Sequence, residues 1–269
     1  MKIKFLIKKI TPPIIIDGIR LIHNRKYGWF GNFNTWEEAQ KFSTGYSAPE
    51  IIAKVRESAL KVKNGEAEYE RDSVIFDEIQ YSWPLLAGLM YAAAKSEGVL
   101  KVLDFGGSLG STYFQNRKFL DGLKDVIWCV VEQKHYVDVG KVDFEDSRLK
   151  FYYDVESCIK EQNPNALVLS SVMQYLEKPY QFLDYILKSN FEFVIVDRTP
   201  FSFKEQIKLQ IVPPWIYKAS YPCWFFEKEK FVDIFQGYGY KVIEEFESLD
   251  GKTENYWFKG FFLEKKNDR

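Results

Sequence analysis

The second half of the chain alternates short apolar runs with amphipathic stretches, and this alternation limits the possible folds more than any other feature. Runs rich in Val, Ile, Leu and Phe, each long enough for one buried strand, occupy residues 99–105, 126–132, 149–154, 166–171 and 191–197. The stretches between them have helical spacing. Apolar strands separated by helices are typical of a parallel, doubly wound sheet, because the helices cover both of its faces.

The end of the chain has a different pattern. A helix expected over residues 227–236 stops at Gly237, and residues 240–248 and 255–266 read as two strands joined by a turn signal at 249–252. The sequence therefore predicts an α/β fold with a doubly wound, Rossmann-like sheet of seven strands. In this sheet a C-terminal antiparallel hairpin follows five parallel strands.

The residues before the first of these strands read as loops and helices. Residues 50–62 have helical spacing, and the apolar stretch 75–94 is expected to break at Ser82, before a proline. We expect residues 1–97 to form an N-terminal extension on the lid or substrate side. Residues 98–269 should form the domain that contains the sheet.

Composition restricts the partners and the compartment. The formal net charge of -1 gives the chain no general attraction to nucleic acid. Cys129, Cys158 and Cys223 lack the paired spacing of a zinc site, and an odd number of cysteines fits a reducing compartment. The apolar run at residues 5–7 is too short for a signal peptide or a membrane span. We therefore expect a cytoplasmic protein with no metal site and no stable membrane insertion.

A glycine-rich turn follows the first parallel strand, which ends near Asp104. Ligands of open parallel sheets bind at the carboxyl ends of the strands, and glycines let a ligand approach the backbone at a helix N-terminus. The dinucleotide fingerprint fails here, because Ser108 and Ser111 stand where it requires glycine, and this disfavours a nucleotide-dependent oxidoreductase. A carboxylate at Asp104 would repel a pyrophosphate, but it suits a ligand that bears positive charge.

The second strand ends in Glu132, and an acidic residue at this position can accept both hydrogen bonds from a ribose diol. Together, Asp104, the glycine turn and Glu132 describe a site for a nucleoside with a cationic tail. These features, with Asp154 after the third strand and the terminal hairpin, resemble the class I S-adenosylmethionine-dependent methyltransferases over about residues 98–266.

The resemblance implies S-adenosylmethionine as cofactor, bound by residues 98–269. In that family the glycine turn holds the amino-acid end of the cofactor, the acid after strand two binds the ribose, and the acid after strand three meets the adenine. The segment after strand four runs beneath the methyl donor. The implied cofactor-binding residues are Asp104, Phe105, Gly106, Gly107, Gly110, Glu132, Asp154, Val155, Ser171 and Met173. Ser108 departs from the pattern, since the family usually has glycine there.

Further segments resemble a family of methyltransferases found among bacterial surface-polysaccharide genes. They lie at residues 29–31, 45–46, 196–200 and 221–225. This resemblance covers nearly the whole chain and implies a setting in surface-glycan biosynthesis.

Three side chains are candidates for the base or for orienting the methyl acceptor. Asp197 ends the fifth strand and is the first candidate, although it could instead cap a turn or pair with Arg198. Tyr175 follows strand four and could either orient the acceptor or pack against the cofactor. His135 is a third candidate for the base, although its place after strand two is nearer to the adenosine than to the methyl group.

The segment 198–226 is longer than a usual connection and rich in aromatic residues, so we expect a loop that acts as an acceptor-binding lid. A packed insert is the alternative. The guanidinium of Arg198 could hold a phosphate or carboxylate of the acceptor, or form a surface salt bridge. The candidate acceptor-binding residues are Arg198, Gln210, Tyr217, Tyr221 and Trp224.

The sequence thus predicts an enzyme that transfers a methyl group from S-adenosylmethionine to a hydroxyl of a sugar or nucleotide-sugar. Its partner would be a small carbohydrate acceptor. The alternative is a non-catalytic scaffold that has the methyltransferase fold and binds a partner, and Ser108 is its main support. The oligomeric state does not follow from the sequence.

Overall fold

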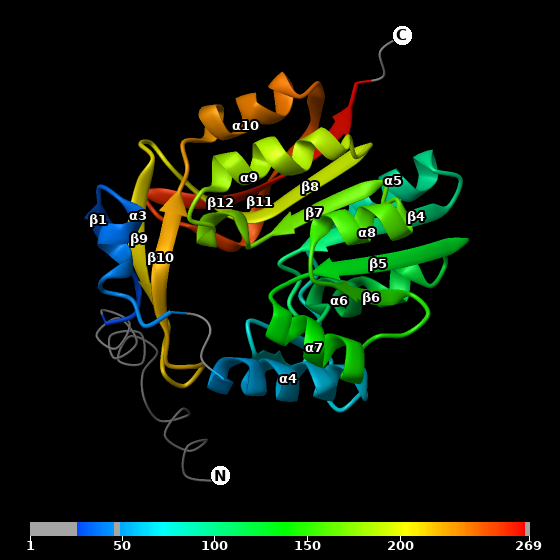
Figure 1. Ribbon diagram of the computed structural model, residues 1–269, viewed down its shortest axis with the longest axis horizontal. Helices are drawn as coiled ribbons and strands as arrows, with labels where there is room; N and C mark the ends of the chain where they lie inside the picture. Colours follow the sequence, from blue (N-terminus) through cyan, green and yellow to red (C-terminus); the bar gives the residue numbers. More distant parts are fainter. Residues whose placement is uncertain (1–25, 46–48, 267–269) are drawn as a thin grey trace, which may run out of the picture. The chain divides into compact units, whose positions relative to one another are not determined.

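The computed structural model describes residues 26–45 and 49–266, and their contacts group into two compact units (Figure 1). The larger unit consists of residues 47–206 and 224–269, and the smaller unit combines residues up to 46 with residues 207–223. These units do not coincide with the division at residue 98 expected from composition. The helices α4 (Pro49–Lys63) and α5 (Trp83–Lys95) both belong to the larger unit, because α5 packs against strands of its sheet.

The larger unit is built on a seven-stranded sheet with the strand order β11-β12-β8-β7-β4-β5-β6. Neighbouring strands from β8 to β6 pair in parallel, whereas β12 pairs antiparallel with both β8 and β11. This order confirms the predicted Rossmann-like sheet with its C-terminal antiparallel hairpin. The strands are β4 (Val99–Phe105), β5 (Asp125–Val131), β6 (Leu149–Tyr152), β7 (Ala166–Ser170), β8 (Phe193–Ser202), β11 (Tyr240–Lys252) and β12 (Tyr256–Lys265).

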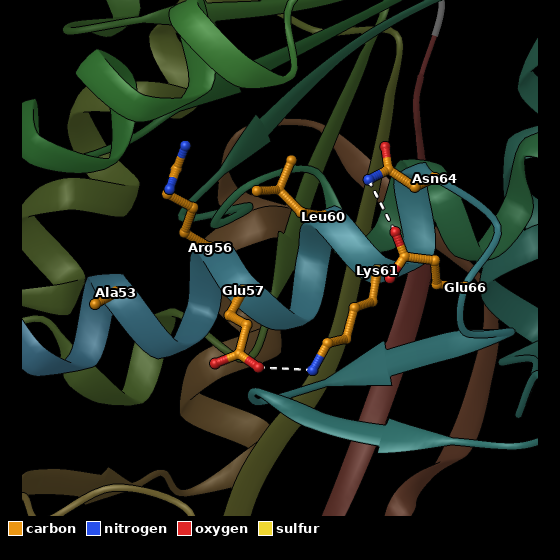
Figure 2. A pocket seen from close by; sticks show the side chains of 7 residues that line it. All are labelled: Ala53, Arg56, Glu57, Leu60, Lys61, Asn64 and Glu66. Atoms are coloured by element: carbon orange, nitrogen blue, oxygen red, sulfur yellow. Dashed lines mark hydrogen bonds and ion pairs between the residues drawn. The ribbon is translucent and has the colours of Figure 1, made fainter.

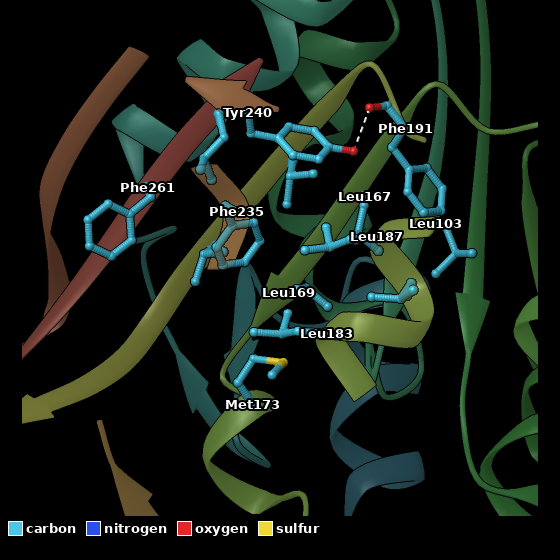
Figure 3. Packing of buried hydrophobic residues seen from close by; sticks show 14 of the residues in the cluster. Leu103, Leu167, Leu169, Met173, Leu183, Leu187, Phe191, Phe235, Tyr240 and Phe261 are labelled. Carbon is cyan, nitrogen blue, oxygen red and sulfur yellow. Dashed lines mark hydrogen bonds between the residues drawn. The ribbon is translucent and has the colours of Figure 1, made fainter. Parts of the chain in front are cut away.

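Helices cover both faces of this sheet. The connecting helices are α6 (Ser111–Leu120), α7 (Lys134–Asp143), α8 (Val155–Gln162), α9 (Pro179–Ile186) and α10 (Lys228–Gly237). One face carries α8, α9 and α10, whose apolar residues share a core with Leu103, Leu167 and Phe261 (Figure 3). Phe262 points to the opposite face, because successive side chains of a strand alternate. There it lies so close to α5 that a Cβ at Gly88 would come within 3.0 Å of its ring.

The strand β4 has β5 on one side and β7 on the other, so the order of the strands reverses there. The carboxyl ends of β4, β5 and β7 therefore border the crevice in which open α/β sheets bind ligands. Asp104 is level with Val130 of β5 and Val168 of β7. Ser170, at the end of β7, is level with Asp197 of β8. Asp104 thus lies near the carboxyl edge of the sheet, beside the end of β7.

The smaller unit contains an antiparallel sheet that the sequence did not predict. Its strands are β1 (Gly28–Phe33), β9 (Gln206–Ile211) and β10 (Ser220–Phe225), in the order β1-β9-β10, and α3 (Trp36–Gln40) follows β1. The expectation of a loop over 198–226 is therefore wrong, because much of that segment forms β9 and β10. In β9, Ile207 and Leu209 are buried while the residues between them are partly exposed, which is the pattern of a half-buried strand.

A second unpredicted element is a short hairpin in the larger unit, formed by β2 (Tyr69–Arg71) and β3 (Val74–Phe76). Strands of three residues are too short for a period-2 pattern to stand out. The hairpin turns through Asp72 and Ser73, which both have positive φ angles, 53° and 66°. It contacts α4 and α6.

Within the described ranges, no helix is long and apolar enough to cross a membrane. The apolar run at residues 5–7, on which the expectation for the N-terminus depends, lies outside the described residues.

Candidate functional site

The turn between β4 and α6 requires glycine because other parts of the chain approach it closely. Gly106 has φ +72°, and a Cβ there would lie 2.4 Å from Cγ2 of Val172. A Cβ at Gly107 would lie 2.5 Å from the carboxyl carbon of Asp104. Gly110 has φ +89° and occupies the cap position before α6. The three glycines named from the sequence therefore form one tight turn at the carboxyl edge of the sheet.

The carboxyl group of Asp104 packs directly against this turn. Asp104 is only 1% exposed, and its Oδ2 accepts a hydrogen bond of 3.0 Å from the indole N–H of Trp128. Burial raises the pKa of Asp104 to about 7, although the hydrogen bond from Trp128 works in the other direction. Phe105, next in the chain, is half-buried and packs against the ring of Phe182.

Glu132 meets the same turn from the end of β5. Its carboxylate accepts hydrogen bonds from the backbone N–H groups of Gln133 and of Ser108, which lies within the glycine turn. Burial raises the pKa of Glu132 to about 7, and the negative charge of Asp104 acts in the same direction. Asp104 and Glu132, at the ends of the paired strands β4 and β5, thus lie close enough to interact.

A third carboxylate, which the sequence did not single out, contacts the start of α6. Glu70 of β2 is 3% exposed and accepts hydrogen bonds from the Ser111 hydroxyl and from the Ser73 N–H. Burial raises its pKa to about 7. Glu70 lies far from the glycine turn in sequence, and a lone acid in a short strand carries no motif that could have identified it.

None of these three carboxylates forms an ion pair with another described residue. A buried charge without a partner is costly, so such groups become protonated or bind an opposite charge. Asp104, Glu132 and Glu70 therefore lie at the turn as carboxyl groups that either hold a proton or suit a cationic ligand.

The other predicted cofactor residues have clear structural contacts. Asp154 caps α8, where its two carboxylate oxygens accept hydrogen bonds from the N–H and hydroxyl of Ser157. Those hydrogen bonds lower the pKa of Asp154. Val155, next to it, is buried. Ser171 follows β7, and its N–H donates to the Asp197 carbonyl. Met173 is fully buried in the core beside Leu183 (Figure 3).

Asp197, the first candidate base, is 1% exposed and already accepts several hydrogen bonds. The Ser248 hydroxyl donates to its Oδ1 at 2.8 Å, and the Arg198 N–H donates to the same oxygen at 2.7 Å. Ser82, before α5, also donates to the carboxylate. Burial raises the pKa of Asp197, and these three donors oppose the shift. The two serines join β8 to β11 and to the start of α5, whereas the guanidinium of Arg198, the partner considered from the sequence, is bonded to Asp72 and Asp250 instead.

The guanidinium of Arg198 is occupied by two acids. Its Nε and Nη2 donate to the carboxylate of Asp250 at 2.8 and 3.1 Å, and Nη2 also donates to Asp72 at 2.7 Å. The side chain is only 15% exposed. These bonds use the Nε and Nη2 donors with which Arg198 could bind a phosphate in two parallel hydrogen bonds. In this structure Arg198 therefore forms salt bridges, the alternative considered from the sequence.

The remaining candidates lie in both units. Tyr175 ends a 3₁₀ turn after β7, and His135 lies in the first turn of α7 beside Tyr136. In the smaller unit, Gln210 accepts a hydrogen bond from the indole of Trp29.

Tyr217 and Tyr221, also in the smaller unit, have their hydroxyls 3.4 Å apart. Trp224 belongs to the larger unit, where its indole N–H donates to the Leu176 carbonyl. The acceptor roles assigned to Gln210, Tyr217, Tyr221 and Trp224 stay predictions.

A shallow hollow on α4 lies apart from these residues (Figure 2). Its polar groups pair with one another or with neighbours: Lys61 binds Glu57, Asn64 donates to Glu66, and Arg56 binds Asp143 of α7. The hollow therefore has no polar side chain set aside for a ligand. Among the described residues no group of His, Cys, Asp and Glu could hold a metal ion.

No protein-family model and no curated protein matches this chain. Similar solved structures include the N-terminal domain of EvdMO1 in the presence of SAH and D-fucose. The two sequences are 11% identical, the match covers 79% of this chain and 97% of that chain, and the TM-score is 0.49. A S-adenosylmethionine-dependent methyltransferase from Clostridium acetobutylicum ATCC 824 has 7% identity, coverages of 70% and 93%, and a TM-score of 0.46.

A third similar structure is SAM-bound CalS10, an amino pentose methyltransferase from Micromonospora echinaspora involved in calicheamicin biosynthesis. It has 11% identity, coverages of 69% and 92%, and a TM-score of 0.43. The strand order of the sheet, and not these distant likenesses, establishes the fold of this chain.

Proposed function

We propose that this chain is a S-adenosylmethionine-dependent methyltransferase that acts on a hydroxyl of a sugar or nucleotide-sugar in surface-glycan biosynthesis. The observation that carries the proposal is the pair Asp104 and Glu132, a buried and a half-buried carboxylate that meet a glycine turn without an ion-pair partner in the described part of the chain. They suit a ligand with a ribose and a positive charge, and S-adenosylmethionine has both.

The residues at the turn fit this cofactor by their chemistry. Asp104 lies against Gly107, whose lack of a side chain lets the carboxyl group pack directly on the backbone of the turn proposed to hold the amino-acid end of the cofactor. Glu132 is fixed by two backbone N–H donors and has lone pairs left for a diol. Bound S-adenosylmethionine would supply an electrophilic methyl group. The chain's own task is then to align donor and acceptor and to keep water out.

The acceptor is proposed from the residues of the insert 198–226. Tyr217, Tyr221 and Trp224 offer amphipathic rings on which a sugar can stack, and Gln210 offers an amide for its hydroxyls. Asp197 stays the proposed base or acceptor-orienting residue, with Tyr175 and His135 as further candidates. The hydrogen bonds that Asp197 accepts would have to rearrange before it could take a proton from an acceptor.

The compartment is part of the same proposal. Cys129, Cys158 and Cys223 are buried, and none of them forms a disulfide within the described part of the chain, as suits a reducing environment; we place the enzyme in the cytoplasm.

The second candidate function is a non-catalytic scaffold with the methyltransferase fold. Ser108 has φ +55° in the glycine turn, a conformation that costs a non-glycine residue on the order of 1 kcal/mol. Asp197 and Arg198, a candidate base and a candidate acceptor-binding residue, both form hydrogen bonds with other groups of the chain. A scaffold would bind S-adenosylmethionine weakly or not at all.

The proposed cofactor site is tested by calorimetric titration of the wild type and two variants with S-adenosylhomocysteine (SAH). Weak or absent binding by the wild type would favour the scaffold. Glu132→Ala removes the proposed ribose acceptor, and we expect at least tenfold weaker binding, because a lost hydrogen bond to a charged group costs about 1.5–3 kcal/mol. Glu192→Ala, at an exposed position before β8, is the matched control and should bind like the wild type. Equal affinities of Glu132→Ala and wild type would refute the proposed site.

A further inference from the structure

We infer that Glu70 is a third cofactor-binding residue, whose carboxylate accepts the α-ammonium group of the cofactor's amino-acid end. This inference rests on the proposed function and adds to it a residue from β2, outside the segment 98–266 that resembles methyltransferases. The β2–β3 hairpin would then form part of the cofactor site.

Glu70 lies next to the turn that is proposed to hold the amino-acid end. Its carboxylate accepts a hydrogen bond from the hydroxyl of Ser111, the first residue of α6 and the one directly after Gly110. A further hydrogen bond, 3.2 Å long, comes from the N–H of Ser73. Two hydrogen bonds fix the carboxylate in place and leave lone pairs unused, because an ionised carboxylate can accept about four.

The hairpin is also fixed to α6 by a second contact. The amide of Gln115, one turn further along the helix, donates to the hydroxyl of Tyr69, next to Glu70. Tyr69 is itself buried. The position of Glu70 relative to the glycine turn is therefore held by two neighbouring residues of β2.

Neither Arg198 nor Arg71 forms an ion pair with Glu70, although Nη1 of Arg71 is buried without a hydrogen-bond partner in the described part of the chain. Burial raises the pKa of Glu70 and the charge of Arg198 lowers it in part, but the guanidinium of Arg198 is hydrogen-bonded to Asp72 and Asp250 and not to Glu70. Arg71 follows Glu70 in the strand, but successive side chains point to opposite sides, and its guanidinium lies over the ring of Phe76. The charge of Asp72 adds to the negative potential at Glu70. A 3% exposed carboxylate in these surroundings lacks a cation.

The adjacent Ser73 has an unused polar atom. Ser73 is 6% exposed, and its hydroxyl has no hydrogen-bond partner within the described part of the chain, although its N–H donates to Glu70. Buried hydroxyls are normally hydrogen-bonded. An ammonium group has three N–H donors, so one that binds Glu70 has others to offer to the Ser73 hydroxyl. The missing cation and the missing donor thus point to the same kind of ligand group.

The test compares two ligands that differ in the amino-acid end. SAH carries the α-ammonium, whereas 5′-methylthioadenosine has the adenosine and lacks that end. Glu70→Gln keeps the size of the side chain and an acceptor for Ser111, but it loses the charge. We expect it to bind SAH about tenfold more weakly than the wild type and to bind 5′-methylthioadenosine unchanged. Glu70→Asp, which keeps the charge, should recover SAH binding in part, and Glu68→Gln, at an exposed position just before β2, should bind both ligands normally.

The outcomes distinguish this inference from the proposed function. If Glu70→Gln binds SAH as tightly as the wild type, Glu70 does not bind the ammonium. Equal loss of both ligands would also overturn the inference, because it would give Glu70 a structural role only. If the wild-type chain binds neither ligand, the proposed function itself fails.

Discussion

At the scale of single residues, the chain places several carboxylates where burial opposes their charge. Asp104, Glu132 and Glu70 each have a pKa raised to about 7, and burial is the main cause in each case. Such groups weaken the fold when they ionise, and they become useful when a cation binds. Two of the three could be predicted from the sequence, because Asp104 and Glu132 end neighbouring strands beside a glycine turn.

The stability of the free protein should therefore fall as the pH rises from about 5 to about 7. In this range the folded chain keeps protons that the same groups lose in the unfolded chain, where a carboxyl pKa is about 4. Each of the three groups can contribute on the order of 1 kcal/mol per pH unit, and the fall should level off above pH 7. Carboxyls with a lowered pKa, such as Asp143 and Asp154, have finished titrating below this range.

Thermal unfolding at pH 5, 6, 7 and 8 measures this dependence. Saturating SAH should flatten the curve, because a bound cation favours the ionised carboxylates. A stability that stays constant or rises between pH 5 and 7 in the free protein would show that the three carboxyls are ionised at ordinary pKa values.

Other residues predicted to belong to the site already form hydrogen bonds within the chain. Asp154 lies at the start of α8, whereas the expectation that Asp197 ends its strand is wrong, because β8 continues to Ser202 along β12. Donors from the chain fill much of the hydrogen-bonding capacity of both carboxylates. A sequence gives the position of such a carboxylate along its own strand. It does not give the partner that folding brings from elsewhere, such as Ser248, which lies 51 residues from Asp197.

At the scale of elements, strong periodicity predicted well and short strands did not. The bounds of β4 agree with the expected 99–105, because a continuous apolar run marks this strand locally. The strands β2 and β3 were missed because they have only three residues each. The strands β1 and β9 pair with each other although they lie far apart in the sequence. The turn expected at 249–252 is instead part of β11, which extends to Lys252.

Arg198 holds the β2–β3 hairpin to the sheet, so removal of the Arg198 side chain should destabilise the larger unit. Arg198→Ala would leave Asp250 and Asp72 without their cation. Although burial opposes it, the charge of Arg198 keeps the pKa of Asp250 below its usual value. We expect a loss of about 2 kcal/mol in the free energy of unfolding, measured by urea denaturation.

The matched control is Arg148→Ala, since Arg148 forms an exposed pair with Asp121. It should change the free energy of unfolding by less than about 0.5 kcal/mol. A loss for Arg198→Ala no larger than that of the control would mean that Arg198 is not structural and is available to a ligand.

At the scale of the whole molecule, the seven-stranded sheet with its antiparallel hairpin was predictable and the grouping of the chain was not. Five apolar runs and a terminal hairpin indicate the seven-stranded sheet, because each run needs burial on both faces. The smaller unit combines β1 with segments near residue 210, and no change in composition marks that pairing. The acceptor is proposed from this aromatic insert, whereas the cofactor is proposed from the edge of the sheet.

The central claim is that the edge of this sheet binds S-adenosylmethionine, and a calorimetric titration of the wild-type chain tests it most directly. S-Adenosylmethionine and SAH would each be titrated into the purified protein, with NAD as the control ligand, whose pyrophosphate Asp104 should repel. We expect micromolar binding of the first two and no binding of NAD. Absence of binding by both S-adenosylmethionine and SAH would contradict the claim and favour the scaffold.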